Sequence, residues 1–150
     1  MLRVAELRPS EVPLVDGQLP LNRLDQHAEG ASTYLIAWDD DTPVGHAHIA
    51  WHGTHVGVPE IQDVFVQPEH RRRGIATLLT LAAEEEARRR GWERISLSVS
   101  AEGNVPARTL YERLGYRDTG DAPVRALGAI MLRGRQVEVD DTLVYLAKSL

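Results

Sequence analysis

The sequence contains no cysteine among its 150 residues. This absence excludes disulfide bonds, a cysteine nucleophile, and zinc or iron–sulfur centres that use cysteine ligands. The chain also has no apolar run approaching the ~20 residues that a membrane-spanning helix needs. The amino terminus, Met1 to Glu6, lacks the apolar core of a signal peptide. We therefore expect a cytoplasmic protein that does not contact a membrane.

Positive charge is also scarce, because 17 lysines and arginines stand against 22 acidic residues and give a net charge of -5. A general nucleic-acid-binding protein needs a basic face, so the composition argues against nucleic acid as a partner. Apolar residues make up 43% and charged residues 26% of the chain, which is ordinary for a globular protein. We expect residues 1–150 to form one domain, burying ~70% of its unfolded surface.

Hydrophobic periodicity predicts an α/β fold. Strands are expected over 2–7, 33–38, 44–51, 61–66 and 95–99, with closing strands over 124–132 and 136–150 that offer an edge for homodimer pairing. Helical segments are expected from Pro9 to about Glu29 with Ser10 as N-cap, over 77–90 before Gly91, and between Asn104 and Gly115. The long helix joins strands 61–66 and 95–99, so these two should be parallel, whereas the earlier strands form an antiparallel hairpin.

The long helix should bury an apolar stripe and expose its charged residues. The stripe follows helical spacing and consists of Ile75, Leu78, Leu79, Ala82 and Ala83. The acidic run Glu84 to Glu86 and the basic run Arg88 to Arg90 are expected to be solvated, and the basic run complements the helix dipole.

A short basic turn precedes this helix, with the sequence Arg71-Arg72-Arg73-Gly74-Ile75-Ala76-Thr77. First-turn N–H groups have no intrahelical partners, and the helix dipole favours negative charge there. Gly74 allows a ligand close to the backbone, and arginines supply charge-assisted donors. The turn therefore predicts a phosphate or pyrophosphate site, with a merely solvated turn as the alternative. It contains neither of the standard nucleotide-binding glycine motifs.

A second motif lies on the shorter helix, in the form N-x-x-A-x-x-L-Y-E-x-L-G-Y from Asn104 to Tyr116. Together with R-x-x-G-x-A from Arg71 to Ala76, it resembles the GNAT superfamily of acyl-CoA-dependent N-acetyltransferases. The order of elements matches across essentially the whole chain. The resemblance implies a GNAT fold, with a mixed central sheet, antiparallel amino-terminal strands, one parallel strand pair and helices on both faces.

The resemblance also implies how acetyl-CoA, the acyl donor, would be held. The backbone of Val64, Phe65 and Val66 should pair with the pantetheine arm, and an amide near Val66 should polarise the thioester carbonyl. Asn104 should contact the cofactor from the opposite side. The pyrophosphate should be held by the backbone amides of Arg72, Arg73, Gly74, Ile75, Ala76 and Thr77.

Tyr111 is the implied general acid that protonates the departing thiolate. The chemistry is consistent, because a tyrosine with pKa ~10 is protonated at neutral pH beside a leaving thiol of pKa ~8.5. The alternative is a core aromatic on the apolar face of its helix.

The general base is less defined. The strand over 95–99 carries no carboxylate, so Asp63 is the first candidate, with Glu60 and Glu102 behind it. A solvated or hydrogen-bonded strand carboxylate is the alternative for Asp63, and a water relay from Ser98 or Ser100 is another route.

Other chemistry-bearing residues receive simpler interpretations. His46 and His48 share a strand face, and His52 and His55 follow in a loop, but no acidic or cysteine partner completes a metal site, so we expect no metal. Trp51 is either a core aromatic or a contact for an amine substrate. The acidic residues Asp16, Asp25 and Glu29 suit a cationic acceptor, although solvation explains them equally well.

These observations predict an N-acetyltransferase that transfers acetyl to a primary amine by direct attack in a ternary complex. The amine could belong to a small molecule or to a peptide or protein. The alternative from another class is a non-catalytic acyl-CoA-binding sensor or partner module on the same fold. A second enzymatic alternative uses another acyl group or a hydroxyl acceptor.

Overall fold

The computed structural model describes residues 1–27 and 30–150. Its strands are β1 (Leu2–Glu6), β2 (Ser32–Asp39), β3 (Thr42–Ala50), β4 (Glu60–Val66), β5 (Arg94–Ser100), β6 (Arg117–Asp118), β7 (Val124–Leu132) and β8 (Arg135–Ser149). Its helices are α1 (Val12–Asp16), α2 (Ile75–Arg89) and α3 (Val105–Arg113), and short 3-10 turns are η1 (Pro9–Glu11), η2 (Leu24–Gln26) and η3 (Pro68–His70). The expected end of the first helical region, near Glu29, lies outside the described residues.

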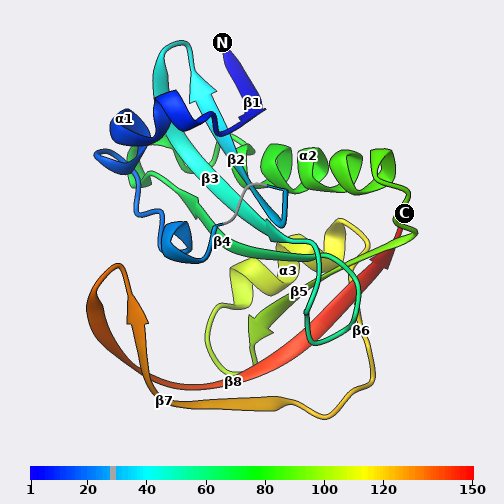
Figure 1. Ribbon diagram of the computed structural model, residues 1–150. Coiled ribbons are helices and arrows are strands. Elements are labelled where there is room, and N and C mark those ends of the chain that lie inside the picture. The colour runs from blue at the N-terminus through cyan, green and yellow to red at the C-terminus, as the bar shows by residue number, and fades with distance from the viewer. Residues whose placement is uncertain (28–29) are drawn as a thin grey trace.

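The described strands form one mixed sheet in the order β1-β2-β3-β4-β5-β8-β6, and β7 pairs with β8 beside this path (Figure 1). β1 to β4 are antiparallel neighbours, β4 and β5 run parallel, and β5 pairs with β8 antiparallel. The predicted α/β class, antiparallel amino-terminal part and single parallel pair are confirmed. The sequence did not predict β6, which is only two residues long.

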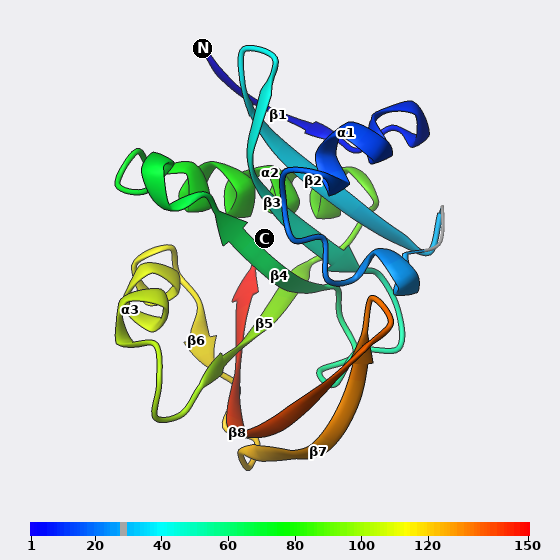
Figure 2. The same ribbon diagram turned by 90° about the vertical axis from the view of Figure 1, so that its left-hand side faces the viewer.

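Helices cover both faces of the sheet, as predicted (Figures 1 and 2). Alternating residues of β2 point to opposite faces of the sheet. Leu35 and Ala37 pack in the core beneath α2. Tyr34, Ile36 and Trp38 point the other way and pack against the segment around α1. α3 packs its Tyr111 into the same core as α2. The two faces thus have separate hydrophobic cores.

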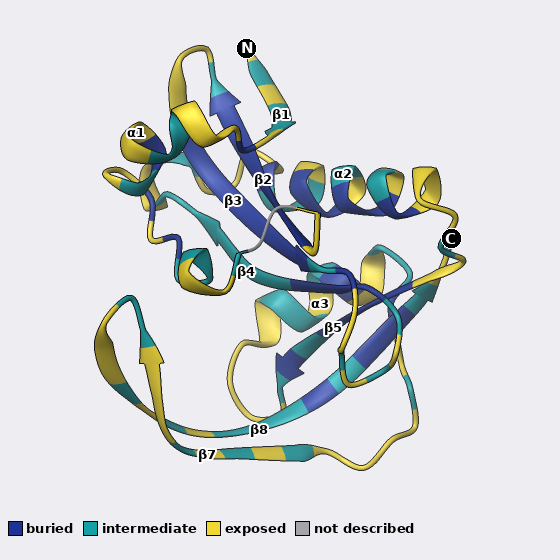
Figure 3. Cartoon of the chain, in the orientation of Figure 1, coloured by how far each residue is buried: buried dark blue, intermediate teal, exposed yellow. Residues whose placement is uncertain are grey.

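α2 buries one side and exposes the opposite side, which Figure 3 shows as a dark blue inner side and a yellow outer side. Its fully buried apolar residues are spaced four apart, at Ile75, Leu79, Ala83 and Ala87. The prediction for Leu78 is wrong, because its side chain is 40% exposed. Successive steps of four keep close to one helix face, and a step of three at Leu78 lies at its margin.

Glu84 corrects the expectation that the acidic run is solvated. It is only 1% exposed and accepts hydrogen bonds from the Tyr116 hydroxyl at 2.9 Å and from Lys148 Nζ at 2.8 Å. Burial, with the Glu84 carboxylate beside it, raises the pKa of Tyr116, so that hydroxyl stays a donor. A buried carboxylate needs such partners, and these two connect α2 to β8 and to the end of α3.

Helix ends follow the predicted chemistry in one case and not in another. Asn104 caps α3, and its side-chain oxygen accepts a hydrogen bond from the Ala107 N–H at 3.1 Å. The N-cap prediction for Ser10 is wrong. There, the Glu11 carboxylate turns back to accept from the Arg8 N–H at 2.9 Å, which satisfies the exposed backbone donor instead.

β7 and β8 form a long hairpin that curls away from the rest of the sheet and returns toward the segment after α1 (Figures 1 and 2). Its two-residue turn is Arg133-Gly134, and both residues have positive φ, 55° and 75°. Such a turn matches the twist of the strands it joins. The Arg133 guanidinium reaches across to Asp16, with nitrogen–oxygen distances of 2.5 and 2.7 Å. This pair ties the hairpin tip to the end of α1.

Candidate functional site

β4 and β5 separate soon after they meet. Their parallel pairing covers only Glu60 with Ser96 and Ile61 with Leu97. Beyond Ile61, β4 pairs with β3 alone and contains a bulge, because His48 faces Gln62 whereas His46 faces Phe65. Asp63 lies in this bulge with φ of 52°, which places Gln62 and Asp63 on the same side of the strand. The sheet is therefore open between β4 and β5 at its middle.

Three adjoining hollows run along this opening. The first, about 260 Å³, lies at the point of separation and is lined by residues of both strands together with Asn104 and Tyr111. The second, about 450 Å³, lies between β4 and α3 and shares Val64, Asn104 and Tyr111 with the first. The third, about 210 Å³, lies at the start of α2 and shares Val66, Arg71 and Leu110 with the second. Neighbouring hollows thus share lining residues, and the three together are called the groove below.

The far end of the groove is the amino terminus of α2. Gly74 is the N-cap residue with φ of 75°, and the first helical hydrogen bond runs from the Leu78 N–H to its carbonyl at 3.0 Å. The amides of Ile75, Ala76 and Thr77 therefore precede the hydrogen-bonded part of the helix. A side-chain carbon at Gly74 would meet nothing within 4 Å, so the approach to these amides is open. This end of the groove suits an anion.

The three predicted arginines do not act alike. Arg71 donates from Nε to the Val66 carbonyl at 3.3 Å and lines two of the hollows, and Arg72 lines the third. The Arg73 guanidinium instead contacts Asp39 at 2.9 Å, and this hydrogen bond lowers the pKa of that carboxyl. Two arginines thus lie at the groove, while Arg73 offers only its backbone there.

The middle of the groove brings together the residues predicted on β4 and α3. Val64, Phe65 and Val66 line its β4 side, and Asn104 lines the opposite side while it caps α3. Because β5 has already diverged, this stretch of β4 has no strand on its groove side. An extended ligand arm could pair with such a backbone edge.

Tyr111 lies where the first two hollows meet. Its side chain is nearly buried, and its ring packs edge-on against Tyr116 with ring centres 5.9 Å apart. Burial raises the pKa of Tyr111 to about 12, so the hydroxyl keeps its proton at neutral pH. No described residue accepts a hydrogen bond from this hydroxyl. It is therefore available to donate to a ligand in the groove.

Asp63 is engaged in the fold. Its carboxylate accepts hydrogen bonds from the Tyr34 hydroxyl at 2.7 Å and the Asn22 N–H at 3.1 Å. Burial and this carboxylate raise the pKa of Tyr34, which therefore remains a donor. His46 Nδ1 also lies 3.8 Å away. These contacts fall on Oδ2, and Oδ1 accepts a longer hydrogen bond from the Asn22 side-chain amide at 3.4 Å, so both oxygens have partners within the fold.

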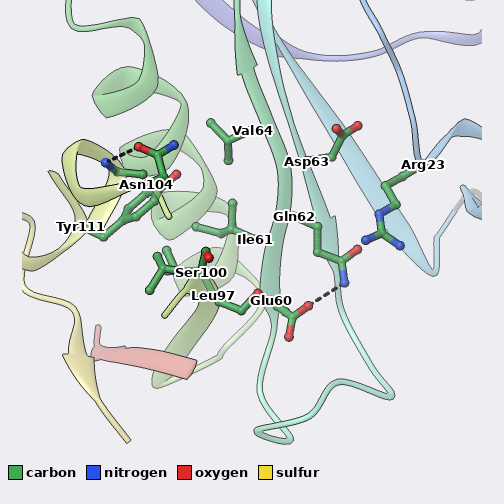
Figure 4. A pocket seen from close by; sticks show the side chains of 13 residues that line it. Arg23, Glu60, Ile61, Gln62, Asp63, Val64, Leu97, Ser100, Asn104 and Tyr111 are labelled. Carbon is green, nitrogen blue, oxygen red and sulfur yellow. Dashed lines mark hydrogen bonds between the residues drawn. The ribbon is translucent and has the colours of Figure 1, made fainter. Parts of the chain in front are cut away.

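Glu60 lies at the start of the splay and is less engaged. Its residue is 8% exposed, and one of its oxygens, Oε2, accepts a hydrogen bond from Gln62 at 2.7 Å. Figure 4 shows Glu60, Gln62 and Arg23 on one side of β4, with Tyr111 and Asn104 on the other. The hollow is thus lined from both sides of the sheet.

The remaining base candidates contribute less. Ser98 and Ser100 both line the first hollow. The Ser100 hydroxyl already donates a hydrogen bond to Asp141 at 2.7 Å. Glu102 is exposed in the loop after β5 and does not line the groove. Sequence analysis missed Gln62 and Arg23 as site residues. Arg23 comes from an irregular segment with no periodicity, and nothing in the sequence indicates that it reaches the cavity.

The histidines and Trp51 have structural surroundings. His46 and His48 are buried against Tyr34, with ring centres 5.6 and 4.7 Å from it. Within the described ranges, no three His, Asp or Glu side chains gather as metal ligands do. Trp51 is a core residue, and the cation over its ring, at 4.0 Å, is Arg90 of the same chain.

The acidic residues that suggested a cationic acceptor are accounted for differently. Asp16 and Asp25 both contact Arg133 of the hairpin tip, Asp25 at 3.5 Å. The hydrogen bond from Arg133 lowers the pKa of Asp16. Glu29 lies outside the described residues.

Comparison with known proteins assigns the chain to a class. Residues 2–116 match the family model described as the acetyltransferase (GNAT) family. The chain therefore belongs to the GNAT family, and its sheet with one splayed parallel pair agrees with that assignment. The hairpin of β7 and β8 lies beyond the matched residues.

Two curated relatives each match part of this chain. The chain is 36% identical over 96 residues to mycothiol acetyltransferase of Rhodococcus erythropolis, covering 61% of this chain and 29% of that protein. It is 34% identical over 86 residues to the uncharacterized N-acetyltransferase YsnE of Bacillus subtilis, covering 57% and 56%. This chain thus spans about a third and about half the length of these curated relatives.

Solved structures share the fold across the whole chain. An IAA acetyltransferase from Bacillus cereus superposes with a TM-score of 0.71 at 17% identity, covering 100% of both chains. A GNAT family acetyltransferase from Elizabethkingia anophelis, solved with acetyl-CoA bound, gives 0.70 at 14% identity and covers 99% and 98%. In the part of the chain described, no helix is both long and apolar enough to cross a membrane.

Proposed function

We propose that this chain is an acetyl-CoA-dependent N-acetyltransferase that transfers the acetyl group directly to a primary amine in a ternary complex. One observation carries the proposal. Three adjoining hollows lead from the amino terminus of α2, along the free edge of β4, to the buried Tyr111 at a gap in the sheet.

The groove fits the donor in its chemistry. The amides of Ile75, Ala76 and Thr77, with Arg71 and Arg72, would hold the pyrophosphate. The unpaired edge of β4 at Val64–Val66 would pair with the amide-rich pantetheine arm, and Asn104 would contact it from α3. The acetyl-CoA-bound Elizabethkingia relative supports this choice of donor at the level of the fold. Bound there, acetyl-CoA supplies an activated acetyl group as a thioester.

The residues around the gap can move the required protons. The amine enters as an ammonium, so it must lose a proton before its nitrogen lone pair can attack the thioester carbonyl. A carbon–nitrogen bond forms, the carbon–sulfur bond breaks, and a backbone amide near Val66 stabilises the developing negative oxygen. Tyr111 donates its proton to the departing sulfur and is reprotonated from solvent. The products are the acetamide, the free thiol and one proton released overall.

Glu60 is the base that the contacts favour over Asp63. Both line the cavity, but Asp63 already accepts hydrogen bonds from Tyr34 and Asn22. Glu60 accepts one, from Gln62, and keeps its other oxygen for a substrate proton. Its position lies across β4 from Tyr111, so acid and base would approach the reacting atoms from opposite sides (Figure 4).

A non-catalytic acyl-CoA-binding module is the second candidate function. The absence of a carboxylate on β5 favours the binding module, because an enzyme would need another group to remove the proton from the amine. The free, protonated Tyr111 hydroxyl favours an enzyme, since binding alone does not need a donor at that point.

Calorimetric titration with acetyl-CoA, followed by a thiol-release assay over a panel of amines, tests the proposal. We expect one-to-one binding in the micromolar range and release of thiol that requires an amine. Tyr111→Phe should lower kcat by at least about tenfold and leave acetyl-CoA affinity nearly unchanged, because only the proton donor is removed.

The outcomes separate the candidates. Binding without turnover for any amine or alcohol would support the binding module. No binding at millimolar acetyl-CoA would remove both. A Tyr111→Phe variant that loses affinity and turnover equally would contradict the role given to this residue.

A further inference from the structure

Arg23 is a cation at the acceptor side of the cavity. It comes from the turn before η2 and is half-buried, and among the described residues it is the only cationic side chain that lines the first hollow. Its Nη1 donates to the Gln26 side chain at 2.9 Å. Its guanidinium forms no ion pair with any residue in the described ranges. Its other N–H groups thus remain for a ligand.

The same cavity wall also carries the carboxylate of Glu60, which forms no ion pair with Arg23. Glu60 and Arg23 both line the hollow, yet no oxygen of Glu60 lies within 4.0 Å of the guanidinium. Figure 4 shows the side chain of Gln62 between them, with its amide bonded to Glu60. One wall of the hollow therefore carries the Glu60 carboxylate and the Arg23 guanidinium, with the neutral Gln62 amide between them.

This arrangement matches a molecule with an amine next to an anionic group. The amine would approach Glu60, and its anionic neighbour would approach Arg23. Guanidinium groups bind planar carboxylates with paired hydrogen bonds. A doubly charged phosphate would meet only one cation here, next to the carboxylates of Glu60 and Asp63, and is therefore disfavoured.

The β7–β8 hairpin contacts segments next to the first hollow, although none of its residues lines that hollow. Its tip is tied to the end of α1 by Arg133 and Asp16, and Arg133 also donates to the Leu21 carbonyl at 3.1 Å. Half-buried Val137 and Val139 alternate with exposed Gln136 and Glu138, so one side of β8 in the curl is apolar. Strand alternation places Val139 on the same side as Asp141, which bonds Ser100 of the cavity wall. The first hollow, with a volume of about 260 Å³, suits a compact acceptor.

We propose that the acetyl acceptor is a free α-amino acid or a similarly compact amino-carboxylate, and that Arg23 binds its carboxylate. This inference rests on the proposed function and names the substrate class of that site. It makes Arg23 a specificity-determining residue of this chain.

The test compares each proteinogenic α-amino acid with its own carboxamide, which keeps the amine and the side chain but removes the negative charge. Thiol release is measured with acetyl-CoA for the wild type, Arg23→Gln, Arg23→Lys and Arg125→Gln. Arg125 is an exposed arginine on β7 that pairs with Asp140 and does not line the cavity, so it is the matched control. Acetyl-CoA affinity and thermal unfolding of every variant report on the donor site and on folding.

For at least one amino acid we expect kcat/KM to exceed that of its carboxamide by about tenfold or more, the usual effect of a charge-assisted hydrogen bond. Arg23→Gln should raise KM for the acid by a similar factor and leave the carboxamide and the acetyl-CoA affinity unchanged. Arg23→Lys should recover part of the loss, and Arg125→Gln should match the wild type.

Equal use of acids and carboxamides, or turnover only with amines that carry no carboxylate, would overturn the inference while the acetyltransferase proposal stands. An equal effect of Arg23→Gln on acid and carboxamide would overturn it as well. Absence of acetyl-CoA binding would instead remove the proposed function itself.

Discussion

His48 shows how one buried residue makes the fold sensitive to acid. It is 2% exposed on β3, its Nδ1 lies 3.2 Å from the Gln62 side-chain oxygen, and its Nε2 has no partner among the described residues. Burial lowers the pKa of His48 to about 4. The unfolded chain therefore binds this proton more readily than the folded chain between about pH 6.5 and pH 4.

We expect stability to fall as the pH falls through this window, by at most about 3 kcal/mol from His48 alone. Urea unfolding at pH 7 and pH 5 measures the change, and His48→Asn should make it smaller. His52→Asn, at an exposed position in the following loop, should leave the wild-type pH dependence intact. An identical pH dependence in wild type and His48→Asn would contradict the assignment.

Asp63 shows a residue whose role depends on its neighbours. Its strand position predicts a candidate base, but its oxygens accept bonds from Asn22 and Tyr34, which lie far away in sequence. The carboxylate thereby connects the segment after α1 to the bulge of β4. Its predicted catalytic role stays untested, and its contacts favour a role in positioning the acceptor side of the cavity.

At the level of elements, the turn from η3 to α2 is the proposed site for the pyrophosphate of the donor. Gly74 has φ of 75° and faces open space at the end of the groove. Gly74→Trp should lower acetyl-CoA affinity by about tenfold or more. The large side chain would cover the backbone N–H groups that are proposed to bind the negatively charged pyrophosphate. Calorimetric titration measures the effect.

The control for this variant is Gly53→Trp. Gly53 has a similar φ of 71° and open space around it, but it lies in the loop after β3, away from the groove. Both variants carry the same backbone strain, on the order of 1–2 kcal/mol. Equal acetyl-CoA affinity in the two would mean that the pyrophosphate site lies elsewhere.

At the scale of the whole molecule, one ion pair joins the carboxyl-terminal hairpin to the amino-terminal helix. Arg133 and Asp16 are each about 30% exposed, and their contact spans most of the chain. A partly solvated pair of this kind contributes about 1 kcal/mol or less to global stability. Its effect should lie in the position of the hairpin tip.

The variant Arg133→Asn distinguishes the ion pair of Arg133 from its role in the turn. Asparagine adopts the positive φ that this position requires, so the turn is retained while the guanidinium is lost. We expect amide hydrogen exchange to become faster at the tip of β7 and β8 and to stay unchanged in α2, with a higher KM for the acceptor. Asp16→Asn should have a smaller effect in the same direction, because Arg133 keeps its contacts with Asp25 and the Leu21 carbonyl. Unchanged exchange at the tip in both variants would show that the tether does not hold the hairpin.

Local patterns in the sequence were sufficient for the class of fold and for the elements on which the proposed donor site lies. Strand alternation, the helix after Gly74, the Asn104 cap and the motif ending at Tyr116 all depend on residues close together in the chain. Their geometry follows from short-range sterics and backbone hydrogen bonding, so the pattern alone is enough. The burial of Glu84 was missed, because its partners Tyr116 and Lys148 come from other elements.

Only the tertiary structure decided the acceptor half. Arg23 reaches the cavity from an irregular segment, Asp63 is engaged by Tyr34 and Asn22, and Arg73 turns to Asp39. Each of these results depends on contacts between distant segments, which periodicity and spacing do not encode. The sequence by itself thus determined that this chain has a GNAT fold with a place for an anionic donor. The packing of β4 and the segment before η2 determined which charged side chains line the cavity.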